Sequence, residues 1–228
     1  PLALYAALRG RASAGYGGVI WTGQTHYLSF SPELFFALKD QRVTTKPMKG
    51  TAQRQADPQK DAEVAERLRT DPKQRAENLM IVDLMRNDLG KICADGTVEV
   101  SELFRSEVHP GLTHLVSDVQ GTLRAGVKWR EIIEALTPPG SVSGAPKSSA
   151  LSIIGENEGV RGPYCGTLGW IHGDRAELSV AIRTFWTTGD SVLRYGTGAG
   201  ITWGSDPAAE WEETQLKARH LISIAGGE

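Results

Sequence analysis

Cysteine is scarce in this sequence, because only Cys93 and Cys165 occur among its 228 residues. Two isolated cysteines neither build a disulfide framework nor supply the paired clusters of a structural zinc site. Proteins without disulfides are typical of reducing compartments. We therefore expect a cytoplasmic protein.

Long apolar runs are also missing, since no stretch approaches the roughly 18 residues of a membrane span. The sequence shows no signal-peptide pattern, and its formal net charge is −2 rather than strongly positive. Internal repeats and low-complexity tracts are absent as well. We therefore expect no membrane association, no binding to nucleic acid and no repeat architecture.

The sequence does contain enough apolar residues, 40% of the total, for a sizeable core. Strands outnumber the helices that could cross between them, which favours antiparallel sheets and the α+β class. We expect helices at 1–9, 57–70, 72–89 and 206–225, around 129–136, and from 146 onward. We expect strands at 17–21, 25–30, 34–45 with a turn at Asp40, 97–108, 111–123, 164–172, 176–188 and 191–196.

Two carboxylates lie one turn apart on the predicted last helix. Glu210 and Glu213, with Lys217 one turn further, fall on one helical face, where neighbouring like charges repel. The preceding segment, 195–201, is rich in glycine, so a ligand can approach its backbone closely. This pattern suggests a divalent cation beside an anionic ligand. The alternative is a solvated helix face behind a turn.

Glu77 opens another predicted helix and borders its apolar stripe. Mg²⁺ prefers oxygen ligands and is commonly held by one or two carboxylates together with water or substrate oxygens. Glu77 and Glu213, with Glu210 farther from the ion, would match that preference. The spacing alone does not show that these residues meet.

At these residues the sequence resembles the chorismate-utilising enzymes, which include the large subunits of anthranilate synthase and aminodeoxychorismate synthase. The resemblance runs from Ser29 to Leu221, and nine motifs in order make it specific. They are Ser31-Pro-Glu33-Leu-Phe, Lys46-Pro-Met-Lys49-Gly-Thr51, Ala76-Glu77-Asn-Leu-Met-Ile-Val-Asp-Leu, His114-Leu-Val-Ser117, Gly140-Ser-Val-Ser-Gly-Ala-Pro-Lys147, Tyr164-Cys-Gly-Thr-Leu-Gly, Ala181-Ile-Arg-Thr184, Gly198-Ala-Gly-Ile201 and Glu210-Trp-Glu-Glu213-Thr. The resemblance implies a two-layer antiparallel β-sandwich with helices packed outside.

Lys49 decides which member of the family the sequence resembles most. Anthranilate synthases usually carry alanine at this position, whereas enzymes that resemble aminodeoxychorismate synthase carry lysine. In that group the lysine is understood to attack C2 of chorismate, so that hydroxide leaves C4 and ammonia adds there. The alternative for Lys49 alone is a surface lysine in a turn.

This chemistry makes demands on two ionisable groups. Lys49 is nucleophilic only when neutral, so its pKa must fall from about 10.4. By resemblance Glu33 is the general acid near C4, and burial must raise its pKa. His114 is placed near the leaving group by resemblance, although a lone histidine in a strand is more often a core residue.

The two carboxylates of chorismate need partners. By resemblance, Mg²⁺ held by Glu77 and Glu213 neutralises the ring carboxylate, and Lys217 assists. The enolpyruvyl carboxylate is assigned by resemblance to Tyr164, Arg183 and the backbone of Gly198, Ala199 and Gly200. Arginine suits this role because its fork donates two hydrogen bonds to a carboxylate. Arg183 is expected in a strand, and pairing with an aspartate is the competing interpretation.

The Gly140–Lys147 motif fits neither a Ser-x-x-Lys hydrolase nor a P-loop. We interpret it as a glycine-rich turn into a helix, with N–H groups available to an anion.

The resemblance predicts a single chorismate-binding catalytic domain over 1–228, lacking an N-terminal part. Cys165 lacks the glycine-flanked turn of an amidotransferase nucleophile, so ammonia should come from a glutamine amidotransferase subunit or fused domain. The predicted reaction is Mg²⁺-dependent amination of chorismate to 4-amino-4-deoxychorismate, which feeds 4-aminobenzoate and folate. The alternatives are anthranilate synthase, an isochorismate-type isomerase and a non-catalytic chorismate-binding chain.

Overall fold

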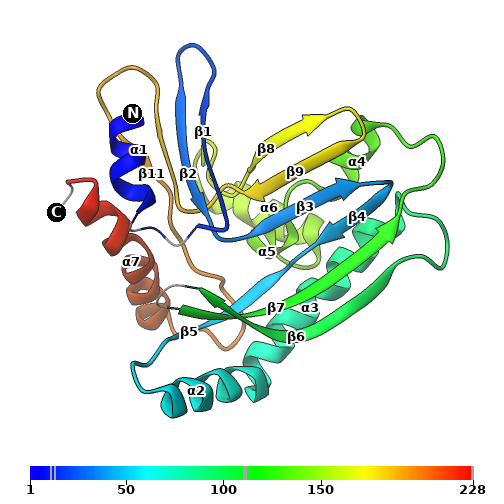
Figure 1. Ribbon diagram of the computed structural model, residues 1–228, viewed down its shortest axis with the longest axis horizontal. Coiled ribbons are helices and arrows are strands. Elements are labelled where there is room, and N and C mark those ends of the chain that lie inside the picture. The colour runs from blue at the N-terminus through cyan, green and yellow to red at the C-terminus, as the bar shows by residue number, and fades with distance from the viewer. Residues whose placement is uncertain (11, 13, 110–111, 227–228) are drawn as a thin grey trace. The chain divides into compact units, whose positions relative to one another are not determined.

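A computed structural model describes residues 1–10, 12, 14–109 and 112–226 (Figure 1). The chain divides into two compact units. Unit 1 consists of Pro1–Glu33, Glu158–Leu168 and Ser179–Glu228. Unit 2 consists of Leu34–Asn157 and Gly169–Leu178. Among the residues described, no helix is both long and apolar enough to cross a membrane.

Unit 1 contains a four-stranded antiparallel sheet in the order β1-β2-β10-β11. Its strands are β1 (Tyr16–Trp21), β2 (His26–Ser31), β10 (Thr184–Thr187) and β11 (Arg194–Tyr195). Two helices, α1 (Leu2–Arg9) and α7 (Pro207–Ile224), bury their apolar faces in this unit. The core that they share with the sheet consists of Leu8, Leu28, Phe30, Phe185 and Leu221. The two ends of the chain therefore contribute to one core.

A second, seven-stranded sheet has the order β5-β7-β4-β3-β9-β8, and β6 pairs with β7. Its strands are β3 (Leu34–Lys39), β4 (Arg42–Thr45), β5 (Met48–Gln53), β6 (Glu99–His109), β7 (Leu112–Thr122), β8 (Thr167–His172) and β9 (Arg175–Val180). The long strand β7 pairs antiparallel with β4, β5 and β6. Most β7 side chains are buried, so β7 forms the centre of this part of unit 2.

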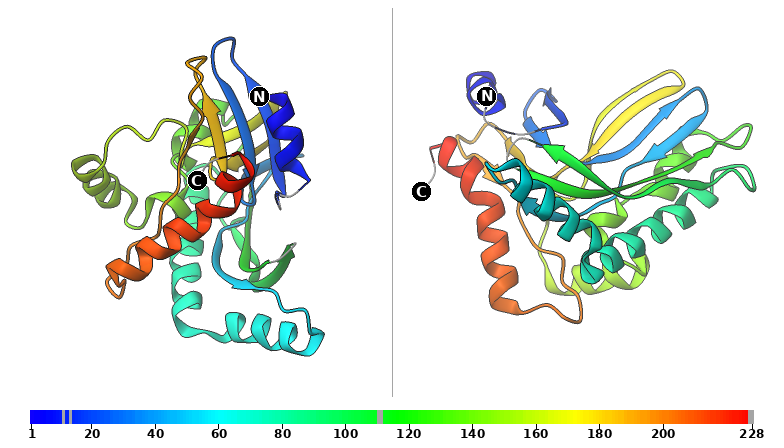
Figure 2. Two further views of the ribbon diagram at one scale, coloured as in Figure 1. Left: turned by 90° about the vertical axis from the view of Figure 1, so that its left-hand side faces the viewer. Right: turned by 60° about the horizontal axis from the view of Figure 1, so that its bottom comes forward.

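Helix α3 (Pro72–Gly90) packs against β5, β6 and β7, and Figure 2 shows it lying along one side of these strands. It follows α2 (Pro58–Thr70), and aspartates Asp57 and Asp71 cap the two helices by accepting backbone hydrogen bonds. Three further helices complete the unit: α4 (Trp129–Leu136), α5 (Gly140–Ser143) and α6 (Lys147–Asn157).

The expected α+β class, with antiparallel sheets and helices packed outside, is confirmed. The predicted helices agree with α1, α2, α3, α4, α6 and α7 to within a few residues, and Asp206 caps α7 as expected. The turn at Asp40 is also present, with left-handed φ angles of 51° at Asp40 and 63° at Gln41. Gly111, the predicted first residue of one strand, lies outside the described residues.

The predicted strand 176–188 is wrong, because it is two strands in different sheets. β9 ends at Val180 and β10 begins at Thr184. Between them the Ile182 N–H bonds to the Val180 carbonyl at 2.8 Å, and Arg183 has a φ of 49°. Arg183 therefore lies in a tight connection rather than on a strand face. Apolar alternation continues across the break since each strand buries a face of its own.

Other boundaries differ from the prediction for local reasons. β5 was not expected, because Met48–Gln53 contains lysine and glycine rather than an apolar alternation. The short helix α5 lies in the segment that we expected to be a turn. The strand expected at 164–172 begins at Thr167, and the one expected at 191–196 is limited to Arg194–Tyr195.

Candidate active site

Lys49 lies on β5, opposite Leu115 of β7. Its side chain is half-buried, and its Nζ donates a hydrogen bond to the carbonyl of Ser141 in α5 at 3.0 Å. The β5–β7 register shifts between Lys49 and Thr51, at Gly50, whose φ is 82°. Glycine adopts this angle without strain, so the motif places a bulge beside the lysine.

His114 is buried on β7 and pairs with Thr51 across the sheet. The Thr51 hydroxyl lies 3.0 Å from His114 Nδ1, so the two form a hydrogen bond. Lys49 and His114 thus stand on neighbouring strands, although their side chains have different partners. The structure confirms that His114 lies in a buried strand, and its catalytic role stays a prediction.

Glu77 is half-buried in α3, next to the fully buried Asn78. The Asn78 side chain donates to the carbonyls of Pro47 and Leu115, and it accepts a 2.6 Å hydrogen bond from Ser117. Pro47 lies two residues before Lys49, and Leu115 lies opposite it. Asn78 therefore fixes the helix that carries Glu77 to the strands that carry Lys49 and His114.

Tyr164 in unit 1 packs against the glycine-rich segment that follows β11. A Cβ atom on Gly196 would lie 2.4 Å from Tyr164 Cγ, and one on Gly198 would lie 2.7 Å from the Tyr164 hydroxyl. Burial raises the pKa of Tyr164, so the phenol stays protonated and is a hydrogen-bond donor. The structure therefore brings together Tyr164 and Gly198, two of the predicted substrate-binding residues.

Gly196→Ala is expected to lower the free energy of unfolding by about 1–3 kcal/mol, because the new methyl overlaps Tyr164 at Cγ, where the ring joins Cβ. Gly204→Ala is the matched control, since nothing lies within 4 Å of a Cβ there. Urea denaturation measures both. In a Tyr164→Gly background, which also removes the Tyr164 Cβ 2.6 Å from the new methyl, the Gly196→Ala penalty should disappear, and its persistence would show that the contact is not its source.

Helix α7 presents the predicted ionic residues to the same segment. Lys217 Nζ lies 2.6 Å from Glu213 and 3.3 Å from the Gly198 carbonyl, to which it donates. Glu210 accepts a 2.7 Å hydrogen bond from Ser205. Ala199 and Gly200 continue the backbone from Gly198. The predicted grouping of Lys217 and Glu213 with the glycine-rich segment is therefore present in unit 1.

Arg183 is half-buried, and no carboxylate among the described residues pairs with it. Burial lowers the pKa of its guanidinium, and the facing Tyr195 acts in the opposite direction. Two backbone bonds, Cys165 N–H to Ala181 and Ala181 N–H to Gly166, hold its connection beside the Tyr164 segment. Pairing with an aspartate, the competing interpretation, is therefore not what the described part of the structure shows.

Glu33 follows β2 and is 5% exposed. Its backbone N–H lies 3.3 Å from the Ser31 hydroxyl, and its carbonyl accepts from Val180 N–H. The burial that a general acid requires is therefore present, and the proton-donating role stays a prediction.

The predicted magnesium ligands come from different units, Glu77 from unit 2 and both Glu210 and Glu213 from unit 1. Within the described ranges, no three or more His, Cys, Asp or Glu side chains form a group that could hold a metal ion. Their carboxylate oxygens have the chemistry that Mg²⁺ prefers. The magnesium site stays a prediction.

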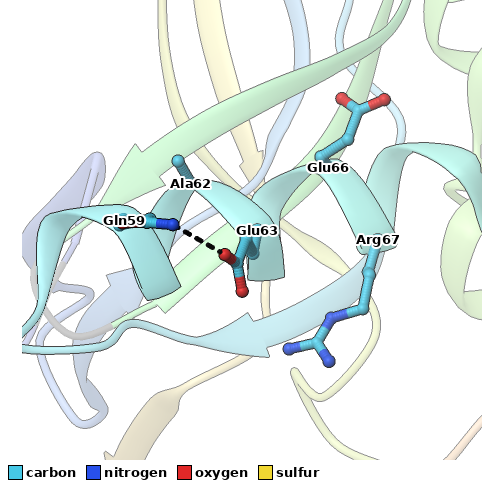
Figure 3. Close-up of a pocket in the computed structure, with 5 residues that line it drawn as sticks. All are labelled: Gln59, Ala62, Glu63, Glu66 and Arg67. Carbon is cyan, nitrogen blue, oxygen red and sulfur yellow. Dashed lines mark hydrogen bonds between the residues drawn. The ribbon is translucent and has the colours of Figure 1, made fainter.

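One shallow depression lies on α2, and none of the predicted site residues lines it. Figure 3 shows its lining of Gln59, Ala62, Glu63, Glu66 and Arg67. All five lie on the exposed face of one helix, and Gln59 donates to Glu63 at 3.4 Å. Such a solvated helix face provides no enclosure for chemistry.

Sequence reasoning missed two groups that contact the predicted catalytic residues, the Thr51 hydroxyl and the Ser141 carbonyl. Both lie in motifs that the sequence made visible. Their pairing depends on strand register and on the path of α5, which spacing does not give.

Comparison with known proteins gives one family. Residues 1–223 match the family model of the chorismate binding enzymes. The chain is 40% identical to anthranilate synthase component 1 of Saccharolobus solfataricus, over 99% of this chain and 54% of that protein. It is 43% identical to aminodeoxychorismate synthase component 1 of Klebsiella aerogenes, over 86% of this chain and 44% of that protein.

A solved structure of an anthranilate synthase component is also similar to this chain. Anthranilate synthase component I of Streptococcus pneumoniae matches with a TM-score of 0.86 at 32% identity, over 97% of this chain and 49% of that one. The chain therefore spans about half the length of the relatives that it matches.

Proposed function

Because the chain belongs to the chorismate binding enzyme family, we propose that it acts on chorismate, and that it aminates C4 with ammonia to give 4-amino-4-deoxychorismate. Similarity alone does not select the reaction, since the relatives include both anthranilate synthase and aminodeoxychorismate synthase at comparable identity. The observation that supports C4 amination is Lys49, a half-buried amine oriented by the Ser141 carbonyl.

The proposed reaction has two displacements. Lys49 attacks C2 with its lone pair, the ring double bond shifts, and the C4 hydroxyl leaves as water after Glu33 donates a proton. Ammonia then adds at C4, the double bond shifts back, and the Lys49–C2 bond breaks. The ammonium group formed at C4 returns one proton to the Glu33 carboxylate. Each displacement is easier than direct replacement of hydroxide. His114 of the adjacent strand β7 forms a polar pair with Thr51 of β5, and this pair would orient the leaving hydroxyl.

Charged and polar groups of unit 1 would hold the substrate. Arg183 is a half-buried cation to which no carboxylate of the described residues is paired, and the Tyr164 hydroxyl and the Gly198–Gly200 backbone lie in the same unit. Together these groups suit the enolpyruvyl carboxylate. Glu77, Glu210 and Glu213 would hold Mg²⁺, which when bound would neutralise the ring carboxylate. Lys217 would add a second positive charge beside it.

Ammonia would come from a glutamine amidotransferase, either a separate subunit or a fused domain. Cys165 does not suit glutamine hydrolysis, because burial raises the pKa of its thiol and keeps it protonated. The product would serve 4-aminobenzoate and folate synthesis in the cytoplasm.

Product analysis tests the proposal. The purified protein is incubated with chorismate, Mg²⁺ and ammonium, and aminodeoxychorismate lyase is then added. We expect 4-aminobenzoate by chromatography, its loss with EDTA and its return with excess Mg²⁺. Fluorescent anthranilate formed before lyase addition would overturn C4 amination in favour of anthranilate synthesis. Chorismate that binds but stays unchanged would identify a non-catalytic chain.

A further inference from the structure

Lys147, the last residue of the Gly140–Lys147 motif, forms a largely enclosed ion pair with Asp88 of α3. Lys147 Nζ lies 2.6 Å from Asp88 Oδ2, and the two side chains are 15% and 1% exposed. The same Nζ donates to the carbonyl of Leu136, the last residue of α4, at 3.1 Å. A cation is favourable at a helix C-terminus. Lys147 therefore joins α3, α4 and α6 at one point.

The other end of the motif rests on the same helix. A Cβ on Gly140 would lie 2.6 Å from both Leu84 Cδ2 and Met85 Cε, so the Gly140 backbone sits directly against α3. Gly144 has φ 111° and ψ 177°, a conformation that essentially only glycine adopts. Leu84 and Asp88 are one turn apart, so both ends of the 140–147 segment contact one side of α3.

Ser141 lies inside this segment, and its carbonyl accepts the hydrogen bond of Lys49. The position of that carbonyl depends on how the segment is held at its two ends. We propose that the Lys147–Asp88 ion pair is a positioning device: it holds the 140–147 segment on α3, so that the Ser141 carbonyl orients the amine of Lys49. The effect on catalysis rests on the proposed function, whereas the effect on Lys49 itself does not.

The test compares Lys147→Met with Lys91→Met. Lys91 binds the other oxygen of the same carboxylate at 2.8 Å, but it follows α3 directly and is 53% exposed. Removing Lys91 deletes an equal charge without releasing the segment. The readout is the acetylation rate of Lys49 in the folded protein without substrate, measured by mass spectrometry of its peptide. We expect a rise of about fivefold in Lys147→Met, consistent with loss of one hydrogen bond, and none in Lys91→Met.

Lys147→Arg keeps the charge and should restore a near wild-type Lys49 rate. If Lys147→Met does not fold, Gly144→Ala provides the second variant. Alanine is strained at the φ of Gly144, so its backbone should shift and displace the 140–147 segment. An unchanged Lys49 acetylation rate in the folded Lys147→Met protein, or in Gly144→Ala, would overturn the proposal.

The catalytic consequence is measured separately. In Lys147→Met we expect kcat for C4 amination to fall roughly 10- to 100-fold, because small displacements of a reacting group are costly, and KM for chorismate to change little. If wild type shows no amination but Lys147→Met still changes Lys49 acetylation, the positioning role stands and the proposed function fails. If amination occurs and Lys147→Met changes neither measurement, the positioning role fails alone.

Discussion

Lys49→Ala is expected to lower the rate of 4-amino-4-deoxychorismate formation roughly a thousandfold or more, because it removes the proposed nucleophile. Binding of chorismate should be retained within a few-fold, since the predicted carboxylate partners are other residues. The two quantities are kcat/KM from the lyase-coupled assay and the dissociation constant from calorimetry. Loss of rate without loss of affinity distinguishes a group that reacts from a group that binds.

Lys46→Ala is the matched control. Lys46 lies three residues earlier and carries the same charge, and its nearest acid is Asp118 at 3.9 Å. Such a loose, partly exposed pair contributes little to stability. We expect activity within a few-fold of wild type. Amination at C4 that persists at a near wild-type rate in Lys49→Ala would contradict covalent attack by Lys49.

Most of the fold was predictable because its signals are local. The N-caps Asp57, Asp71 and Asp206 each precede a proline and begin α2, α3 and α7 where the sequence indicates. The break around Arg183 was not predictable from periodicity, because the alternation of apolar residues continues across it. Which sheet each strand joins is a tertiary choice that the local pattern does not contain.

The candidate site also contains contacts that were predictable from the sequence and contacts that were not. The family resemblance grouped Tyr164 with Gly198, and helical spacing placed Glu213 and Lys217 on one face; the structure places both pairs in contact. The Ser141 carbonyl beside Lys49 was not predictable, because a backbone oxygen leaves no trace in side-chain chemistry. The ion pair between Asp88 and Lys147 was not predictable for a different reason: its side chains are 59 positions apart in the sequence, and only the tertiary fold brings them together.

Arg183→Met is expected to weaken chorismate binding by roughly 10- to 100-fold, the range expected for losing hydrogen bonds to a charged group. Arg183 has no carboxylate partner among the described residues, and burial already lowers the pKa of its guanidinium. An arginine stays charged at neutral pH even so. Arg183→Lys keeps the charge but loses the planar fork, so it should give an intermediate affinity. Calorimetry measures all three proteins.

Arg194→Met is the matched control, because Arg194 is an arginine of the same unit that already pairs with Asp190. Its replacement should leave the affinity for chorismate unchanged.

The stability of the free protein provides a second test of the role of Arg183. A cation held half-buried for a ligand carries a desolvation cost in the free protein, so Arg183→Met should leave the unfolding midpoint unchanged or raise it. A structural arginine would behave in the opposite way, since its loss would lower the midpoint and weaken binding only indirectly.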